Sequence, residues 1–266
     1  MQTLTRTDLN FVLSRCPRDI IKQLRVNAGK LFLAGGFIRA TISGEKVADI
    51  DLFGISHDDL LRIAKDLTLE RKGRYFATKN AITVLAPPRF PVQFITRWVF
   101  DTTEKLIASF DFTVCQAGIW AERLPDSTEM KDGKLVPKEN YRFHSAISDT
   151  YYADLAARRL VYTHPVREEE AGGSLMRVIK FVKKGYNVQA PTLAGVIARI
   201  ITKLSTNGLE TYEETGTKTP IHRIKEDWAA KVVTGLLREV DPLVVIDGTD
   251  FVDEHEIIAD EQNQTI

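Results

Sequence analysis

Residues 31–39 of this 266-residue chain read LFLAGGFIR, and residues 47–53 read VADIDLF. In the second stretch, two aspartates, Asp49 and Asp51, alternate with apolar residues. Side chains at i and i+2 of a strand point to the same face, so the two carboxylates should stand side by side. Adjacent carboxylates repel unless a cation lies between them, and hard cations such as Mg²⁺ take oxygen ligands. The alternation therefore predicts a metal site.

The first stretch ends its apolar run in the glycine pair Gly35 and Gly36. Glycine lets backbone N–H groups approach an anion closely, and a helix that follows presents its positive end to that anion. We therefore expect a phosphate cradle at this pair. A phosphate cradle close in sequence to a two-carboxylate metal site predicts phosphoryl transfer from a nucleotide.

Composition narrows the class of protein. Apolar residues make up 44% of the chain, which is ordinary for a globular protein, and Lys+Arg and Asp+Glu are equal at 36 each. The equal numbers of basic and acidic residues argue against a strongly basic nucleic-acid binder. Cys16 and Cys115 lie far apart, so we expect no disulfide framework and a cytoplasmic protein. No apolar run approaches ~20 residues, so we expect no membrane span, and the N-terminus has no apolar signal-peptide core.

The first half of the chain alternates predicted helices and strands, which indicates an α+β fold with a mixed sheet and flanking helices. We expect helices over 7–15, 18–27, 101–108 and from Ser56, and strands over 30–34, 49–54, 75–86, 92–97 and 110–120. Residues 121–145 predict a hairpin and a linker.

Beyond this region the pattern becomes helical, with helices expected over 149–162, 174–185, 191–206 and 222–240 and a loop over 207–220. We therefore predict a catalytic domain over 1–145, a helical domain over 146–246 and an acidic, mobile tail over 247–266.

Five segments in this order resemble the DNA polymerase β-like nucleotidyltransferase superfamily, most closely its branch of bacterial CCA-adding enzymes and poly(A) polymerases. They are GGFIRA (35–40), DID (49–51), SFDFTVCQA (109–117), DLAARRL (154–160) and MRVIKF (176–181). The resemblance implies a nucleotidyltransferase head followed by a helical neck. It implies transfer of a nucleoside monophosphate from an NTP to an acceptor hydroxyl, with an RNA or tRNA 3′ end as the expected acceptor.

The resemblance also assigns roles to residues. Two Mg²⁺ ions, with Mn²⁺ as the alternative metal, would bind Asp49 and Asp51, and Asp111 would act as a further catalytic or sugar-contacting residue. The nucleotide would be bound by Gly35, Gly36, Arg39, Asp111, Arg158 and Arg177. Each role has a structural alternative: Arg39 as half of a salt bridge, Asp111 as a hydrogen-bonded core acid, and Arg158 and Arg177 as solvated helix residues.

The chain departs from the branch at three places. Ala40 replaces an acid, Ser109-Phe110 replaces an arginine pair, and Gln93 stands where the superfamily often has a third carboxylate. These departures leave two other functions open. One is nucleotidyl transfer to a protein or small molecule, as in toxins and regulators. The other is an inactive nucleotidyltransferase fold that serves as a binding or structural module.

Overall fold

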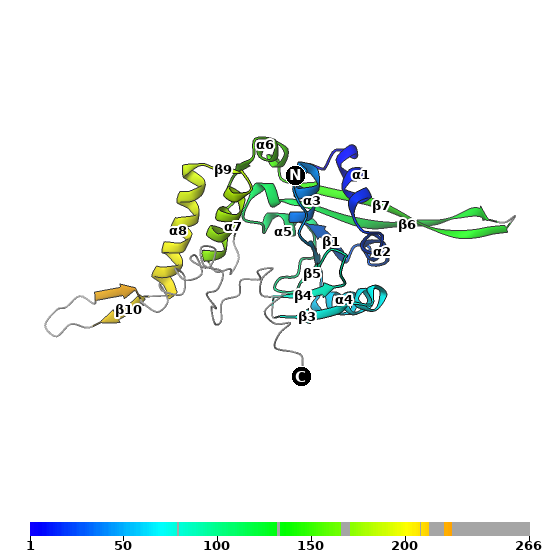
Figure 1. The fold of residues 1–266 in the computed structure, drawn as a ribbon, viewed down its shortest axis with the longest axis horizontal. Coiled ribbons are helices and arrows are strands. Elements are labelled where there is room, and N and C mark those ends of the chain that lie inside the picture. Colours follow the sequence, from blue (N-terminus) through cyan, green and yellow to red (C-terminus); the bar gives the residue numbers. More distant parts are fainter. Residues whose placement is uncertain (79, 132–133, 166–170, 208, 213–220, 225–266) are drawn as a thin grey trace. The chain divides into compact units, whose positions relative to one another are not determined.

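The computed structural model describes residues 1–78, 80–131, 134–165, 171–207, 209–212 and 221–224 (Figure 1). Contacts within the described chain define two compact units, one ending at Ala157 and the next beginning at Arg158. The boundary that we predicted at residue 145 would fall inside a strand, β7 (Lys134–Ile147). The predicted tail over 247–266 and the predicted helix beyond residue 224 lie outside the described residues.

The first unit is built on one seven-stranded sheet with the order β3-β4-β5-β2-β1-β6-β7. Strand β2 pairs with β5 in parallel, and every other neighbouring pair of this sheet is antiparallel. The remaining strands are β1 (Leu31–Ala34), β2 (Ile50–Gly54), β3 (Arg74–Ala77), β4 (Ala81–Leu85), β5 (Val92–Ile95) and β6 (Ala117–Lys131). The mixed α+β architecture that we predicted is confirmed.

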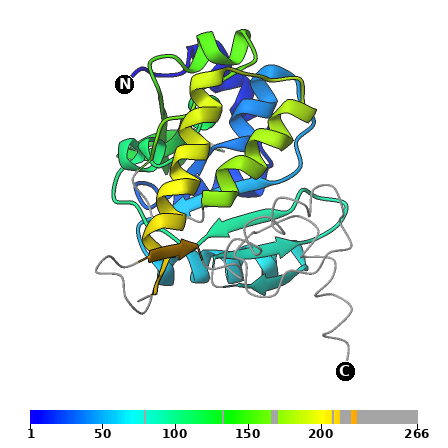
Figure 2. The ribbon, with the colours of Figure 1, turned by 90° about the vertical axis from the view of Figure 1, so that its left-hand side faces the viewer.

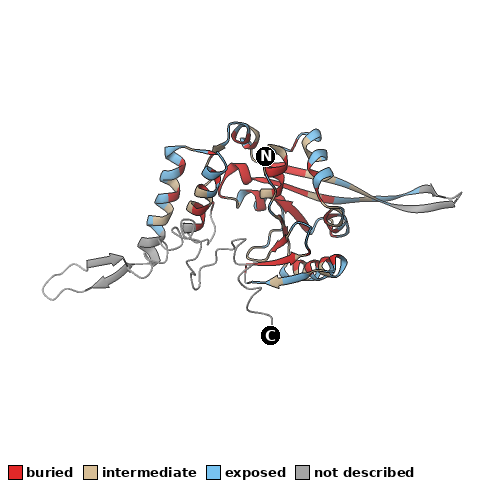
Figure 3. Ribbon diagram, viewed as in Figure 1, coloured by how far each residue is buried: buried red, intermediate tan, exposed pale blue. Residues whose placement is uncertain are grey.

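Helices cover both faces of this sheet. They are α1 (Arg6–Arg15), α2 (Arg18–Val26), α3 (Gly36–Ser43), α4 (His57–Arg71), α5 (Thr103–Ala108) and α6 (Tyr151–Ala156), with a 3₁₀ turn, η1 (Thr113–Cys115). On one face, a Cβ at Gly54 would lie 2.8 Å from Leu60 of α4. On the opposite face, Phe32 and Phe53 are register neighbours and pack with Leu106 of α5. Figure 3 shows the buried residues concentrated in the sheet between these layers.

Local sequence explains where the helices begin. Helix α4 starts after Ser56, whose hydroxyl accepts a hydrogen bond from the Asp59 N–H at 3.1 Å. Thr5 and Thr102 cap α1 and α5 in the same way. The predicted and observed helix starts agree within two residues, and Ser56 is the cap among these that the prediction used.

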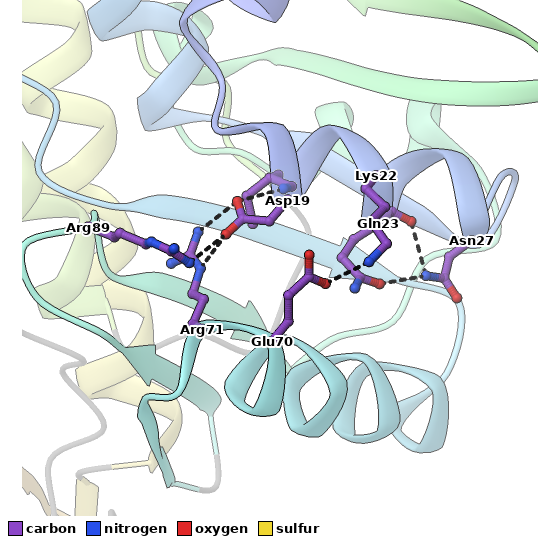
Figure 4. Close-up of polar contacts among 8 residues, drawn as sticks. Asp19, Lys22, Gln23, Asn27, Glu70, Arg71 and Arg89 are labelled. Carbon is purple, nitrogen blue, oxygen red and sulfur yellow. Dashed lines mark hydrogen bonds and ion pairs between the residues drawn. The ribbon is translucent and has the colours of Figure 1, made fainter.

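A buried ionic network joins α2 to α4 (Figure 4). The Arg71 guanidinium donates to both oxygens of Asp19, from Nε at 2.9 Å and from Nη2 at 3.2 Å, and from Nη1 to the Phe90 carbonyl at 2.9 Å. Arg89 adds a longer contact with Asp19 at 3.4 Å. Cys16 is buried beside this network, and burial, followed by the charge of Asp19, raises the pKa of its thiol to about 12.

The predicted strand over 75–86 and the predicted linker within 121–145 both differ from the structure. The run 75–86 is a hairpin rather than one strand, because the Thr78 hydroxyl accepts from the N–H groups of Asn80 and Ala81 and turns the chain. The described residues between 121 and 145 contain no separate linker. They are most of the long antiparallel pair β6–β7, which carries exposed residues where it extends beyond the sheet (Figure 3).

The described part of the second unit is mainly helical. Figure 2 shows its helices α7 (Ala171–Lys183) and α8 (Ala190–Asn207) side by side. It also contains two short two-stranded sheets, β8 (Arg159–Leu160) with β9 (Asn187–Val188) and β10 (Leu209–Tyr212) with β11 (Ile221–Ile224). The predicted helix over 149–162 is therefore too long at its C-terminal end, the predicted loop over 207–220 contains β10, and residues 222–224 are strand. None of the helices in the described ranges has the length and apolar character to cross a bilayer.

Candidate active site

The turn from β1 into α3 requires glycine at its first position. Gly35 has φ +76° and ψ −123°, a conformation that side chains with a Cβ rarely adopt. A Cβ at this position would lie 3.2 Å from Cε1 of Phe110, and the Gly35 N–H donates to the Ala117 carbonyl at 3.0 Å. The Gly35 N–H is thus used within the sheet, and the next N–H groups of the turn belong to the start of α3.

Gly35→Ala should lower the free energy of unfolding by about 2–3 kcal/mol, the sum of backbone strain and contact with Phe110. Gly29→Ala is the matched control, because Gly29 also has positive φ, at +74°, but has nothing within 4 Å of the added Cβ. We expect Gly29→Ala to lower the free energy of unfolding by only about 1–2 kcal/mol. Urea unfolding measures both losses. If both variants lost the same free energy of unfolding, contact between the added Cβ and Phe110 would not contribute to the loss.

Asp51, the second of the two aspartates, lies beside this turn. Asp49 immediately precedes β2 and Asp51 is its second residue, and both are half-buried. Gly36, the first residue of α3, lies close enough to Asp51 that a Cβ there would stand 4.0 Å from Oδ2 of Asp51. The structure therefore brings the start of a helix and a carboxylate of the pair together.

The strand next to β2 extends this polar site. Asp51 is the register neighbour of Gln93 on β5, and Gln93 is the register neighbour of Thr83 on β4. Paired residues share a face of the sheet, so the three side chains form one row. Gln93 and Thr83 are 6% and 5% exposed.

Asp111 is placed differently from our prediction, which put it on a strand over 110–120. It lies in a bend before the 3₁₀ turn η1, and β6 begins only at Ala117. Asp154 of α6 accepts a hydrogen bond from Thr113 at 2.7 Å and from Thr150 at 2.7 Å, which fixes η1 against α6. Asp111 is 2% exposed.

The described residues contain no group of three or more His, Cys, Asp or Glu side chains arranged to hold a metal ion. Asp49, Asp51 and Asp111 therefore do not form a three-carboxylate cluster. A pair of half-buried carboxylates still suits a hard divalent cation, because oxygen donors and net negative charge are what such an ion requires. Among the described residues, a third protein donor would have to be a neutral oxygen.

Arg39 is held by a salt bridge. Its Nε lies 3.4 Å from Oε2 of Glu45, and both side chains are more than nine-tenths buried. Its Nη1 also donates to Sγ of Cys115 at 3.6 Å. The Arg39 guanidinium thus links α3 to the loop that follows it and to η1. A contact of Arg39 with a nucleotide stays a prediction.

An aromatic cluster next to the aspartates was not anticipated from the sequence. The rings of Phe110 and Phe53 meet edge to face at 5.7 Å between centroids, and Phe100 meets Phe53 at 6.3 Å. Phe53 follows Asp51 by two residues and so shares its face of β2. The only signal in the sequence was the replacement of a charged pair by Ser109-Phe110, which here provides an apolar wall.

Comparisons with solved structures identify the fold. A Thermotoga maritima CCA-adding enzyme complexed with tRNA matches 76% of this chain with a TM-score of 0.51 and 15% identity. CCA-adding enzymes with ATP and with CTP match 76% and 78% of the chain, with TM-scores of 0.52 and 0.53 and 18% identity. The chain has a nucleotidyltransferase fold. The predicted resemblance to the CCA-adding branch is confirmed at the level of fold.

This nucleotidyltransferase-fold chain spans about half the length of those enzymes, covering 46–48% of each. A family model described as Gabija anti-defense 2 (Gad2) matches residues 5–124, which include β1, α3, β2 and β5. No curated protein matches the sequence. The sequence match thus covers the two aspartates and Gln93 and ends inside β6.

The two remaining predicted nucleotide ligands, Arg158 and Arg177, belong to the second unit of the nucleotidyltransferase-fold chain. Arg158 does not lie on a helix as predicted: it has φ +46° and donates from Nη1 to the Lys184 carbonyl at 2.8 Å. Arg177 lies on α7 and is half-buried. A contact of either residue with a nucleotide stays a prediction.

A separate open groove of about 640 Å³ occurs elsewhere in the first unit. Its walls come from α1, α2 and β7, and include Leu13, Arg18, Ile21, Arg25 and Tyr141. Neither the aspartates nor the glycine pair lines it. The groove is therefore not the site to which the sequence motifs point.

Proposed function

We propose that this chain is a metal-dependent nucleotidyltransferase that uses Asp49 and Asp51. One observation supports the proposal most directly: a Cβ at Gly36, where α3 begins, would stand only 4.0 Å from Oδ2 of Asp51. The start of a helix has unpaired N–H groups and a partial positive charge, which suit a triphosphate. The carboxylates next to it suit the cations that accompany a triphosphate.

Each residue of the site would have a separate role in the reaction. Asp49 and Asp51 would hold Mg²⁺, two ions in the full reaction, which supply Lewis acidity at the acceptor hydroxyl and the leaving pyrophosphate. The first turn of α3 would orient the β- and γ-phosphates, and the salt bridge between Arg39 and Glu45 would keep that helix in place. Phe53 and Phe110 would exclude water from one side of the site.

The reaction needs no dedicated protein base. The acceptor oxygen forms a bond to the α-phosphorus as the bond to the bridging oxygen of pyrophosphate breaks. The hydroxyl proton leaves to solvent. The chain contributes position and charge, which are the main components of catalysis in phosphoryl transfer.

We propose an RNA 3′ end as the first acceptor to test, because the matched folds include CCA-adding enzymes solved with tRNA, ATP and CTP. The Gad2 match favours a second candidate, a component of the defence that this family is described as counteracting. In that case the acceptor is a hydroxyl of a defence protein, or a hydroxyl of a nucleic acid that is part of that defence.

Labelled transfer would test the proposal and separate the acceptors. The full chain is incubated with each α-³²P-labelled NTP and Mg²⁺, with total RNA in one series and a lysate containing the Gabija proteins in another. We expect label in one macromolecular fraction, and none with Asp51→Asn. Absence of transfer in every series, together with absence of NTP binding in calorimetry, would contradict the proposal. Metal-dependent NTP binding without transfer would instead indicate an inactive binding module.

A further inference from the structure

The groove between α1, α2 and β7 has a positively charged wall. Arg18, Lys22 and Arg25 are exposed, line the groove, and lie on one face of α2 at helical spacing. Lys22 pairs with an acid of α4 at 3.0 Å, but neither arginine has an ion pair among the described residues. Glu139, the acid in the lining, accepts a hydrogen bond from the Tyr141 hydroxyl at 2.9 Å. Two arginines of the groove are therefore available for an acidic ligand.

The opposite wall of the groove is the open edge of a sheet, because β7 is the last strand of the seven. The Ala121 carbonyl of β6 accepts from the Gly29 N–H at 3.1 Å, on the side away from β7. Its register neighbour Phe143 therefore directs its own backbone groups away from β6, and Tyr141 does the same by alternation. Among the described residues, no segment outside β6 bonds to the backbone of Phe143 or Tyr141. The edge thus presents unpaired donors and acceptors about 6.8 Å apart.

Another part of this edge shows how an added strand fits. Gln2 and Ile147 exchange both backbone hydrogen bonds, at 2.9 and 3.1 Å, as an antiparallel bridge. The Leu4 N–H then donates to the hydroxyl of Ser145 at 3.0 Å. The N-terminal segment leaves the edge at this point and enters α1. It therefore closes the end of β7 and leaves the part that borders the groove open.

We propose that this groove binds an extended acidic segment of a partner protein, which adds to the edge of β7 as a further antiparallel strand. Phe143 and Tyr141 face α2, since the Arg25 guanidinium lies 5.6 Å from the centre of the Phe143 ring and Tyr141 lines the groove. A strand paired with these residues directs every second side chain to the same face. Carboxylates at those positions meet Arg18 and Arg25, so the charges of the two surfaces are complementary.

The groove favours a polypeptide over a nucleic acid. The edge carbonyls require regularly spaced donors, which a polypeptide backbone supplies and a phosphate backbone does not. The lining also contains apolar side chains from both helices, Leu13, Ile21 and Val26, and Val26 is 64% exposed. These side chains can pack against the apolar residues of an added strand.

Fluorescence anisotropy with the full chain and a labelled eight-residue peptide of alternating glutamate and valine tests the charge complementarity. We expect Arg18→Glu and Arg25→Glu each to weaken binding at least about tenfold, because a like charge then faces the peptide. Lys65→Glu reverses an exposed charge of α4 outside the groove and is the matched control, which should bind like the parent chain. Asp51→Asn should also bind like the parent chain, so the outcome does not depend on the proposed function.

N-methylation of the peptide tests the strand pairing. In an antiparallel pair, alternate N–H groups of the added strand face its neighbour. A methyl group on the nitrogen of a central glutamate, whose side chain would face α2, should abolish binding. A methyl group on the next valine should leave most of it. Equal effects of the two methyl groups would overturn the addition of a strand to β7.

Other results would also overturn the proposal. One is the absence of peptide binding to the parent chain, and another is equal binding by Arg18→Glu, Arg25→Glu and the parent. Tighter binding of a single-stranded RNA, weakened by the same substitutions, would make the ligand a nucleic acid. Peptide binding that requires amides in place of the acidic residues of 247–266 would make this chain's own C-terminal segment the occupant. Circular dichroism and thermal unfolding of each variant establish that it is folded.

Discussion

Asp51→Asn should reduce nucleotidyl transfer at least about a thousandfold, and Asp49→Asn should have a similar effect. Asparagine keeps the shape of the side chain but removes the charge that holds a cation between the two residues. A loss of about 4 kcal/mol in transition-state stabilisation corresponds to this factor. The measurement is the initial rate of label transfer from an α-³²P-NTP at saturating Mg²⁺.

The control for these variants is Asp66→Asn, which removes an exposed carboxylate from α4, where Asp66 pairs with Arg62 at 3.5 Å. We expect it to retain the full rate. Because asparagine is isosteric, we expect Asp49→Asn and Asp51→Asn to keep their circular dichroism spectrum. Full transfer by both variants would show that the chemistry takes place elsewhere.

Arg71→Met should lower the free energy of unfolding by about 3–5 kcal/mol. The Arg71 side chain is 0% exposed and its partner Asp19 is 12% exposed, so the variant leaves a largely buried carboxylate with only the longer ion pair to Arg89. It also removes the hydrogen bond to the Phe90 carbonyl, which connects α4 to the loop before β5. Urea unfolding followed by circular dichroism measures the loss.

Arg89→Met is the matched control, because Arg89 contacts the same Asp19 oxygen at 3.4 Å but is 52% exposed. We expect a loss of only about 0.2–1 kcal/mol. The double variant Asp19→Asn with Arg71→Met should be less destabilised than the sum of its single variants, since no buried charge remains. If Arg71→Met and Arg89→Met lowered the free energy of unfolding equally, burial would not determine how much each ion pair contributes to stability.

The same network predicts a pH dependence. Burial raises the pKa of the Asp19 carboxyl, but the hydrogen bond and charge of Arg71, the Ile20 N–H and Arg89 together hold it below its ordinary value. A depressed folded-state pKa adds stability above the unfolded-state value, about 3.9, and this stability is lost as pH falls through the folded-state value. The difference in stability between the parent chain and Arg71→Met should therefore shrink below about pH 4.

The sequence predicted the central part of the fold because the signals there are local or strongly periodic. The cap at Ser56 defines a helix start through contacts within one turn. The alternation around Asp51 defines β2 and the face on which the acids lie. The resemblance put Gln93 at the position of a third carboxylate, and Gln93 is the register neighbour of Asp51.

The misplaced elements depend on contacts between distant residues. The β-branched run around Thr113 has the composition of a strand, but the side chain of Asp154 holds that threonine in a 3₁₀ turn. Asp111 therefore lies in a bend rather than on a strand. The packing of Phe110 on Gly35 likewise joins residues from distant parts of the chain, and no local pattern predicts it.

The parallel pairing of β2 with β5 also has a consequence for the order in which the chain folds. Antiparallel neighbours can form from a local hairpin, but β2 and β5 are separated by α4 and the β3–β4 hairpin. A growing polypeptide that has not yet reached Val92 contains both aspartates and the glycine pair, yet lacks the strand that pairs with β2 in parallel. If the proposed function holds, a bound metal–nucleotide pair would preferentially stabilise chains that have completed this long-range pairing.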